Sequence, residues 1–351
     1  MKRKILVKGI SAILLVIVLY LLYNTLLSPT KVALVNFPSY QVSNIILSND
    51  SRFICVDEVG EENASDLKNY DAVLLFGPGL RLTEGQVKNI EIAGEKGAAV
   101  YTFVFSSDII KNQNIDSLQQ KELDTYYGNR CKENFKNMLR YIRKEFDNKK
   151  LTAKQAEKPI IIPSDILYYL DDKKYYSTAE ELTSYLKENG IYKEGASRIA
   201  FISGMTSPLE GNRSYIDSLI VGLEVAGYNI YPISASAKRL TFLKEINPDA
   251  VVYLPMGRLG GDDLVEWLKQ QNIPLFCPYP VMQSHDEWVN DKRGQVGGFL
   301  TARIVLPEID GGIYPLPIST QNQHSNQYFV FDPEPERLKN FIANVDNYLK
   351  L

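Results

Sequence analysis

The chain has 351 residues, of which 45% are hydrophobic and 23% charged, and its formal net charge is -3 at pH 7. This length can bury a large core and form two or more domains. A chain so close to neutral has no broad basic face, so nucleic acid is excluded as an expected partner. The three cysteines are far apart and odd in number, which predicts neither a disulfide framework nor a cysteine metal site.

The amino terminus predicts a membrane anchor at residues 1–29. Lysine and arginine precede Ile10–Leu27, a run without charge that, together with Ile5–Val7, can cross a hydrocarbon core of about 30 Å as one helix. The positive charge predicts a single-pass protein with a cytoplasmic N-terminus and a periplasmic body. A cleaved signal peptide is the alternative, but the run is longer than usual and no small-residue cleavage site follows it.

A first α/β domain is expected at residues 30–150. Short apolar runs alternate there with helical patterns, which indicates βαβ units and a mainly parallel sheet covered on both faces. Thr83 and Gln86 form a capping box for a helix that extends to Lys96, and one long helix is expected from Ile115 to Asn148. The predicted strands are Lys31–Phe37, Phe53–Val56, Asp71–Phe76 and Ala98–Phe105.

A connector at residues 151–196 contains a helix capped by Ser177 with Glu180, and a second α/β unit follows at 197–318. In this unit Asn212 is expected to cap a helix that extends to Ala226. Residues 319–351 would begin a further segment. The fold class is therefore α/β, with parallel-sheet βαβ domains in tandem behind an N-terminal transmembrane helix. The unit's main predicted strands are Ile199–Gly204, 228–235 and Ala250–Leu254.

The stretch Arg303–Pro315, RIVLPEIDGGIYP, is the first candidate site. Its apolar start predicts a buried strand, and Glu308, Asp310, Gly311 and Gly312 follow. A strand that ends in acid and glycine would place charge and accessible backbone at the carboxyl edge of a sheet, where open α/β sheets bind ligands. The alternative is a plain exit from strand to turn.

The remaining motifs are weaker. The loop Gly257–Gly261 matches neither the dinucleotide nor the P-loop pattern, so it is interpreted as a turn, with anion binding aided by Arg258 as the alternative. His285, beside Asp286, could be a metal ligand or a proton carrier. His324 lies in a polar run typical of a solvated loop, and two isolated histidines do not make a metal site.

Two of these segments together resemble a known family. AFISGMTSPLEGNRSYIDSLIVGLEVAGYNIYPI (200–233) and GQVGGFLTARIVLPEIDGGIYPL (294–316) are similar to the large subunit of cobaltochelatase (CobN) and the H subunit of magnesium chelatase. The resemblance extends over about residues 31–351, and LPEIDGG is its most specific element. The predicted anchor is more similar to the membrane-anchored HmuS-like proteins that accompany haem uptake.

The resemblance implies a function in tetrapyrrole chemistry. Such large subunits bind a porphyrin, haem or corrin and carry out insertion or removal of a divalent metal, as in cobalamin biosynthesis, while separate AAA+ chelatase subunits hydrolyse ATP. No resident cofactor is implied for this segment. By resemblance, Glu308 and Asp310 would be catalytic. Gly311 and Gly312 would allow the backbone close to the substrate. Apart from the resemblance, Asn212 and His285 are further candidates for substrate contacts.

Length separates this chain from the family, whose subunits are several times longer. Because the sequence ends inside an expected helix, Glu334–Leu351, we expect a truncated or split chelatase subunit that is inactive alone. Two other classes of function stay open, namely a membrane-anchored, periplasmic-type module that binds a small ligand and a scaffold that docks partner subunits. A change in the Soret band of an added porphyrin would distinguish the chelatase from both.

Overall fold

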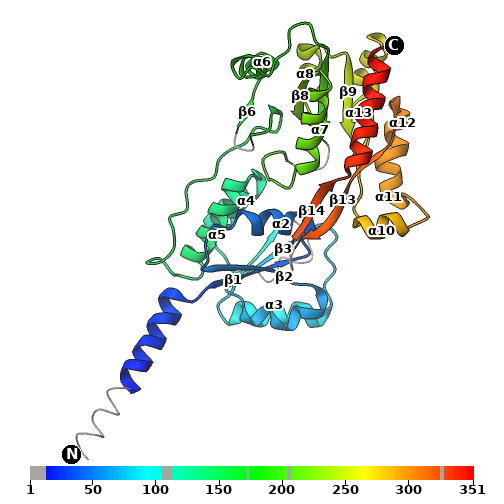
Figure 1. The fold of residues 1–351 in the computed structure, drawn as a ribbon. Coiled ribbons are helices and arrows are strands. Elements are labelled where there is room, and N and C mark those ends of the chain that lie inside the picture. The colour runs from blue at the N-terminus through cyan, green and yellow to red at the C-terminus, as the bar shows by residue number, and fades with distance from the viewer. Residues whose placement is uncertain (1–12, 105–112, 172–173, 204–206, 325–327) are drawn as a thin grey trace, which may run out of the picture. The chain divides into compact units, whose positions relative to one another are not determined.

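The computed structural model describes residues 13–104, 113–171, 174–203, 207–324 and 328–351, with the backbone alone at 61–64 (Figure 1). The chain forms two compact units, Met1–Ile161 and Ile162–Leu351, which are treated separately below. The second unit starts earlier than residue 197, because part of the expected connector joins its sheet.

Unit 1 contains the four predicted strands in one parallel sheet. The strand order is β2-β1-β3-β4, so β1 lies between the two strands that follow it in the chain. The strands β1, β3 and β4 are short and largely apolar, as expected for a sheet that is buried on both faces, whereas the edge strand β2 ends in Asp57 and Glu58. The strands are β1 (Thr30–Val35), β2 (Ile54–Glu58), β3 (Ala72–Phe76) and β4 (Ala99–Phe103).

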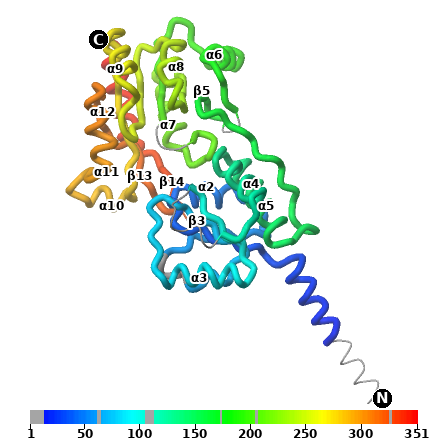
Figure 2. Tube along the Cα trace, turned by 180° about the vertical axis from the view of Figure 1, so that it is seen from behind, coloured from blue at the N-terminus to red at the C-terminus, as the bar shows by residue number. Residues whose placement is uncertain are grey.

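Helices cover both faces of this sheet, as predicted. The helices α2 (Ser39–Ser48), α4 (Ser117–Gly128) and α5 (Lys132–Glu145) lie on one face (Figures 1 and 2). The opposite face is covered by η2 (Glu61–Asn69) and α3 (Glu84–Glu95), which begins at the predicted Thr83 capping box.

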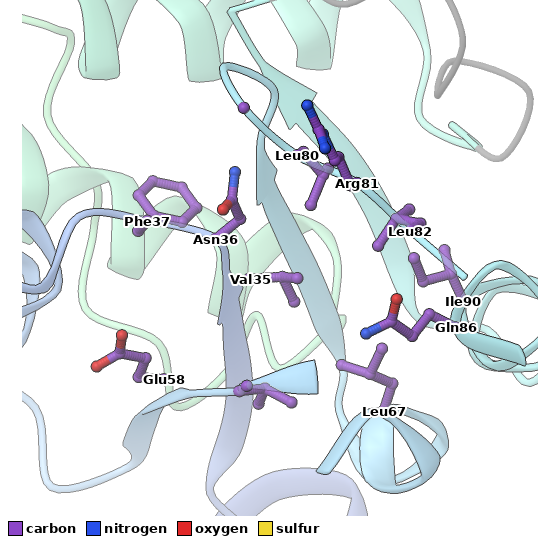
Figure 3. Close-up of a pocket in the computed structure, with 13 residues that line it drawn as sticks. Val35, Asn36, Phe37, Glu58, Leu67, Leu80, Arg81, Leu82, Gln86 and Ile90 are labelled. Carbon is purple, nitrogen blue, oxygen red and sulfur yellow. The ribbon is translucent and has the colours of Figure 1, made fainter. Parts of the chain in front are cut away.

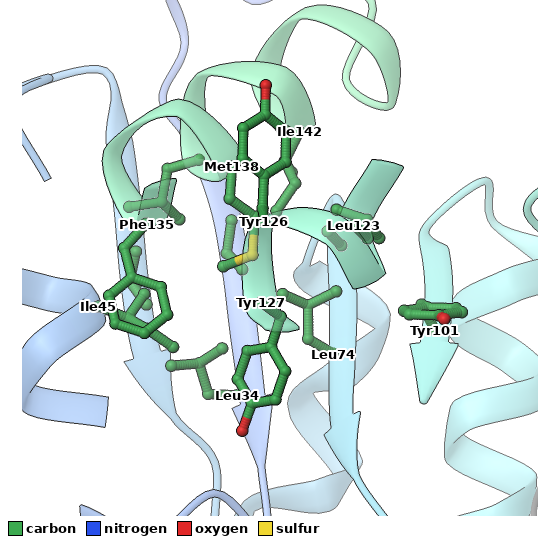
Figure 4. Close-up of a cluster of buried hydrophobic side chains, with 14 of the residues drawn as sticks. Leu34, Ile45, Leu74, Tyr101, Leu123, Tyr126, Tyr127, Phe135, Met138 and Ile142 are labelled. Atoms are coloured by element: carbon green, nitrogen blue, oxygen red, sulfur yellow. The ribbon is translucent and has the colours of Figure 1, made fainter. Parts of the chain in front are cut away.

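The single long helix expected at 115–148 is two helices. Asn129 ends α4, and Cys131 caps α5 by accepting a hydrogen bond from the backbone of Asn134. The break lets both helices turn apolar side chains onto the same face of the sheet, where Tyr127 and Phe135 join the buried cluster (Figure 4).

The described part of the predicted anchor is helical over residues 13–22 and continues in a π-helical turn, η1 (Tyr23–Leu27). The apolar side chains of residues 13–22 are open to solvent, from 47% exposure at Ile17 to 64% at Val16. Within the ranges that the structure describes, no helix has the length and apolarity needed to cross a membrane. Residues 1–12, where the predicted span begins, lie outside those ranges.

Unit 2 is built on a seven-stranded sheet in the order β12-β10-β9-β7-β8-β5-β6. The strands β7, β8, β9, β10 and β12 are parallel, while β5 and β6 from the expected connector pair in the antiparallel sense. The strands are β5 (Ile166–Tyr168), β6 (Tyr175–Tyr176), β7 (Arg198–Ser203), β8 (Asn229–Ser234), β9 (Ala250–Leu254), β10 (Leu275–Phe276) and β12 (Gly312–Ile313).

Two predicted helix caps are displaced. The helix α6 (Ala179–Glu188) is capped by Thr178 instead of Ser177, because the Thr178 hydroxyl accepts from the Glu181 N–H. The Ser177 N–H donates to the carboxylate of Glu181 and not to that of Glu180, the expected acceptor. The helix α7 (Ser214–Val225) begins two residues beyond Asn212, whose left-handed backbone (φ 53°) precedes the helix. The helices α8 (Arg239–Ile246) and α9 (Asp262–Gln270) complete the βαβ series.

The strand predicted from Arg303 is wrong, because this stretch is helical. The helix α11 (Gly297–Leu300), the π-helical turn η4 (Thr301–Val305) and α12 (Leu306–Ile309) follow one another directly. Pro307 lacks an N–H group and cannot complete a regular α-helical ladder. The π-helical turn η4 before Pro307 agrees with this, because the Leu306 N–H donates to the carbonyl of Thr301, five residues back, and not to one four residues back as in an α-helix.

A small third sheet holds the carboxyl-terminal part of unit 2. Its strand order is β11-β13-β14, with β11 (Tyr279–Pro280), β13 (Pro317–His324) and β14 (Tyr328–Pro333). The helix α10 (His285–Asn290) contacts β13, and α13 (Pro335–Leu349) packs against α7. Residues 319–351, expected to start a further segment, are thus an integral part of unit 2.

Candidate functional site

Asp310 is a buried structural anion in this fold. Its side chain has no solvent exposure. One carboxylate oxygen accepts from Arg258 Nε at 2.7 Å, and the other accepts from the backbone N–H of Leu259 at 2.6 Å. Both partners belong to the loop after β9, so Asp310 ties this loop to the end of α12. A carboxylate with both oxygens engaged this way is poorly placed to take a proton from a substrate.

Glu308 is the exposed member of the acidic pair. It lines a cavity of about 330 Å³ with the end of α9, the start of β10 and Tyr348 of α13. Lys269 lines the same cavity, so a carboxylate and an ammonium group share it. Of the two carboxylates, Glu308 is therefore the one that a ligand can reach and that can accept a proton or contribute to metal binding.

The position of this element differs from the one expected. Glu308 lies in α12, Asp310 and Gly311 follow this helix, and Gly312 begins β12, whereas the prediction placed all four at the carboxyl end of a strand. The rule that places ligands at the carboxyl edge of a parallel sheet does not cover this location.

Gly311 and Gly312 are each required by the structure, for different reasons. Gly311 has a φ of 88°, the left-handed conformation that commonly ends a helix. A Cβ atom at Gly312 would lie 2.6 Å from Cys277 Sγ and 2.8 Å from the carbonyl oxygen of Pro307. Gly312 is thus required because Cys277 and the Pro307 backbone pack closely against it, whereas the prediction expected a substrate there.

The Cys277 thiol is not available as a nucleophile. Its side chain is buried, and burial, with a smaller contribution from Asp310, raises the pKa of Cys277 to about 12. The thiol therefore stays protonated at neutral pH and packs as a small apolar group.

His285 lies at the start of α10, half exposed, in a network with the third sheet. Its Nδ1 is 2.9 Å from Glu334 Oε1, and its backbone N–H donates to Asn322 at 2.9 Å. The hydrogen bond and the negative charge of Glu334 raise the pKa of His285 above its ordinary value. His324, expected in a solvated loop, is instead at the end of β13, where its Nε2 is 2.7 Å from Asp332 Oδ2.

Asn212 connects the α7 loop to the third sheet. Its Nδ2 donates to the carbonyl of Phe329 at 3.0 Å, and its Oδ1 accepts from the N–H of Phe331 at 2.9 Å. The side chain thus pairs with β14 as a neighbouring strand would. Both ends of its amide are engaged, so a substrate contact would have to displace β14.

Sequence reasoning gives too little weight to Arg258 and Glu334, the partners of the predicted residues. Arg258 is a candidate for an anionic ligand by sequence, yet its guanidinium bonds to Asp310 and Asp262. Its place in a glycine-rich loop after a predicted strand is a usable signal. The chain offers no local signal for Glu334, which lies 49 positions from His285.

Arg303 is a third residue to which sequence reasoning gives too little weight. Its side chain is fully buried under the ring of Phe299, 4.5 Å from the ring centroid, and it donates to the carbonyl of Pro280. Burial lowers the pKa of Arg303 to about 10.

Across the described residues, no three histidine, cysteine or acidic side chains are grouped so as to hold a metal ion.

Comparison with known proteins gives the family. The sequence model of the CobN/Magnesium Chelatase family matches residues 124–351, so the chain belongs to that family. The H subunit of the magnesium chelatase of Chlorobaculum parvum is 24% identical over 210 residues, which are 55% of this chain and 16% of that protein. An uncharacterized protein of Methanocaldococcus jannaschii is 24% identical over 235 residues, covering 60% of this chain and 18% of the relative.

A solved structure supports the same fold. The catalytic subunit of cobaltochelatase from Mycobacterium tuberculosis matches with a TM-score of 0.65 and 17% identity, over 92% of this chain and 27% of that protein. The match includes unit 1, most of which lies before the residues that the family model covers. The chain spans less than a fifth of the curated relatives that it matches.

Proposed function

We propose that this chain is a portion of a tetrapyrrole metal-chelatase large subunit, binding a porphyrin, haem or corrin while a divalent metal is inserted or removed. The observation that carries the proposal is the family match over residues 124–351, supported by the cobaltochelatase fold over 92% of the chain. Because the relatives are much longer, other polypeptide segments would supply the rest of the macrocycle site. The AAA+ partners would be separate subunits.

Within this proposal Glu308 is the residue that acts on the ligand. Its carboxylate is exposed on a cavity of about 330 Å³ and can accept a pyrrole N–H proton or contact the metal in transit. Asp310 acts as a positioning residue, since it holds the Arg258 loop against the end of α12. His285, held by Glu334, is a second group able to carry a proton.

Soret spectroscopy of the full chain tests this function. Haem and protoporphyrin IX are titrated into the wild type, Glu308→Gln and Glu336→Gln; the last removes the same charge at an exposed position of α13 that does not line the cavity. We expect a saturable Soret shift in wild type and Glu336→Gln, and weaker binding in Glu308→Gln.

The outcomes separate the classes of function. An unchanged Soret band with the wild type would reject tetrapyrrole binding and favour a periplasmic-type small-ligand module or a scaffold. Equal binding by the two variants would remove Glu308 from the site. We also propose that the chain cannot turn over alone. Metal insertion or removal by the isolated chain, at a rate comparable to that of a full-length relative, would refute this.

We further propose that the amino-terminal segment anchors the protein in a membrane with the body in the periplasm. Support comes from the uncharged run Ile10–Leu27 and from the solvent exposure of the apolar side chains in its described helical part. Alkaline carbonate extraction of membranes tests it. We expect the wild type to remain in the pellet and a variant with Leu15, Val18 and Leu22 changed to lysine to be released.

A further inference from the structure

Unit 1 contains a cavity of about 380 Å³ that the proposed chelatase function does not use (Figure 3). Its lining comes from the residues at and after the carboxyl ends of β1, β2 and β3, together with η2 and α3. In the strand order β2-β1-β3-β4, the chain leaves β1 toward β2 and leaves β3 toward β4, on the other side. The cavity thus lies at a topological switch point, where open parallel sheets bind their ligands.

The floor of the cavity is apolar. Val35, Leu67, Leu82 and Ile90 line it, and Leu67 and Ile90 are at most 2% exposed. The volume is at the small end of the range for ligand pockets, which suits a ligand with a compact apolar body.

Three polar side chains stand over this floor. Gln86 is buried, and its Oε1 accepts from the Thr83 N–H, so its orientation is fixed with Nε2 toward the cavity (Figure 3). Asn36 is fixed by donating from Nδ2 to the carbonyls of Phe76 and Pro78, which leaves its Oδ1 as an acceptor.

The third polar group is Arg81, an exposed guanidinium at the edge of the cavity. Across the described ranges, Arg81 makes no ion pair or side-chain hydrogen bond. A guanidinium matches the planar, two-oxygen geometry of a carboxylate. Glu58 lines another part of the cavity (Figure 3), and its negative charge disfavours a second anionic group on the ligand.

A nucleotide fits this site poorly. The loop after β1 continues as Asn36, Phe37 and Pro38 into α2, without the glycines that let a phosphate approach the backbone. We propose that this cavity binds a small monocarboxylate with an aliphatic or aromatic body, its carboxylate on Arg81 and its body on the floor. The inference goes beyond the chelatase function and holds whether or not the chain binds a tetrapyrrole.

Methyl NMR of the full chain in lipid nanodiscs tests the proposal with two probes, 4-methylpentanoate and its neutral amide. The variants are Arg81→Gln and, as a matched control, Lys88→Gln, which removes one positive charge from an exposed position of α3 that does not line the cavity. In the wild type we expect saturable shifts at the methyl groups of Leu67, Leu82 and Ile90, with the carboxylate binding about tenfold more tightly than the amide.

The variants decide the role of Arg81. We expect Arg81→Gln to weaken carboxylate binding about tenfold and to leave amide binding unchanged, while Lys88→Gln matches the wild type. The proposal is overturned by an absence of saturable shifts up to about 10 mM probe, by equal affinity for acid and amide, or by equal carboxylate affinities of the two variants.

Discussion

The two units contain the same parallel-sheet arrangement but use its switch point differently. In unit 1, β1 lies between β2 and β3, and in unit 2, β7 lies between β8 and β9. Unit 1 leaves a cavity at this edge, with Arg81 unpaired within the described ranges. In unit 2 the loop after β9 is tied down, because Arg258 is paired with Asp310 and Leu259 is fully buried.

The loop after β7 adds to this difference. Arg213 is 4% exposed, and its guanidinium donates to the carbonyls of Pro208 and Tyr169 and to Asp217. The strand order therefore creates a switch point in each unit, between β1 and β3 and between β7 and β9. The side chains of the loops at that point determine whether a ligand can bind there. The substitutions below test this contrast, from the largest expected effect to the smallest.

Replacing Asp310 with alanine should have the largest effect, because unit 2 relies on this buried carboxylate. The change removes two hydrogen bonds to a charged group and leaves the Leu259 N–H buried without a partner, so we expect a loss of about 3 kcal/mol in the free energy of unfolding. Urea denaturation followed by tryptophan fluorescence reads unit 2 selectively, since both tryptophans of the chain, Trp267 and Trp288, lie there.

Glu308→Ala is the matched control for Asp310→Ala. Glu308 is exposed, so its removal should change stability by less than about 0.5 kcal/mol. If the two variants were equally stable, Asp310 would not be needed to hold the loop after β9 in place. The contrast between an open switch point in unit 1 and a closed one in unit 2 would then lose its main support.

Gly312→Ala should have the next largest effect. The added Cβ would meet Cys277 Sγ and the Pro307 backbone at less than 3 Å, which calls for a backbone shift and costs about 2 kcal/mol. At Gly311 a Cβ meets no atom within 4 Å, so Gly311→Ala should cost only the strain of its positive φ, about 1 kcal/mol. The same fluorescence assay ranks them, and the reverse order would contradict the packing at Gly312.

The four strands of unit 1 and the strands β7, β8 and β9 of unit 2 were predictable because a parallel sheet buried on both faces produces short, nearly continuous apolar runs such as DAVLLF. The helix over residues 297–309 was missed for a related reason. A short apolar run such as RIVL fits a buried helix as well as a strand, and the glycines and Pro307 around it favoured the wrong choice.

The site was predictable only in part, because its contacts join residues distant in the chain. Glu308 and Asp310 are two positions apart, yet one is exposed and the other buried. The difference arises from Arg258, 52 positions from Asp310, and no local pattern encodes that contact. The cavity of unit 1 was likewise not predicted, since Gln86 gave a signal only as a helix cap.

Asn36→Ala tests the open switch point of unit 1. The side chain holds the ends of β1 and β3 together through the carbonyls of Phe76 and Pro78, and the residue has a φ of 61°. We expect a loss of about 1 kcal/mol, since these hydrogen bonds are exposed and uncharged. Hydrogen exchange of the β1 and β3 peptides should report it, with tryptophan fluorescence unchanged.

A glycine at the same position separates the two contributions. Asn36→Gly removes the amide but accepts the positive φ, so its stability should lie between wild type and Asn36→Ala. If neither variant speeds exchange in β1 or β3, the amide does not hold this edge, and the shape of the cavity must be set by its apolar lining alone.

The smallest expected effect concerns His285 and pH. Glu334 raises the pKa of His285 above 6.5, while Asp286 adds a weaker attraction and Arg337 lies over the neighbouring Trp288 ring. A group whose pKa is raised by folding stabilises the folded state fully below its unfolded pKa, and this contribution is lost as pH rises through the folded pKa. Unit 2 should therefore lose a little stability on going from below about pH 6 to above about pH 8.

The variant Glu334→Gln isolates this contribution. It keeps a side chain that can accept from His285 but removes the charge, so the His285 pKa should fall toward its ordinary value and the pH dependence of unfolding should shrink. NMR titration of the imidazole Cε1–H signals measures this directly, with His324 beside Asp332 as the internal reference. A His285 titration unchanged by Glu334→Gln would show that solvent screens the pair completely. The α10 contact would then be held by the Asn322 hydrogen bond to the His285 backbone.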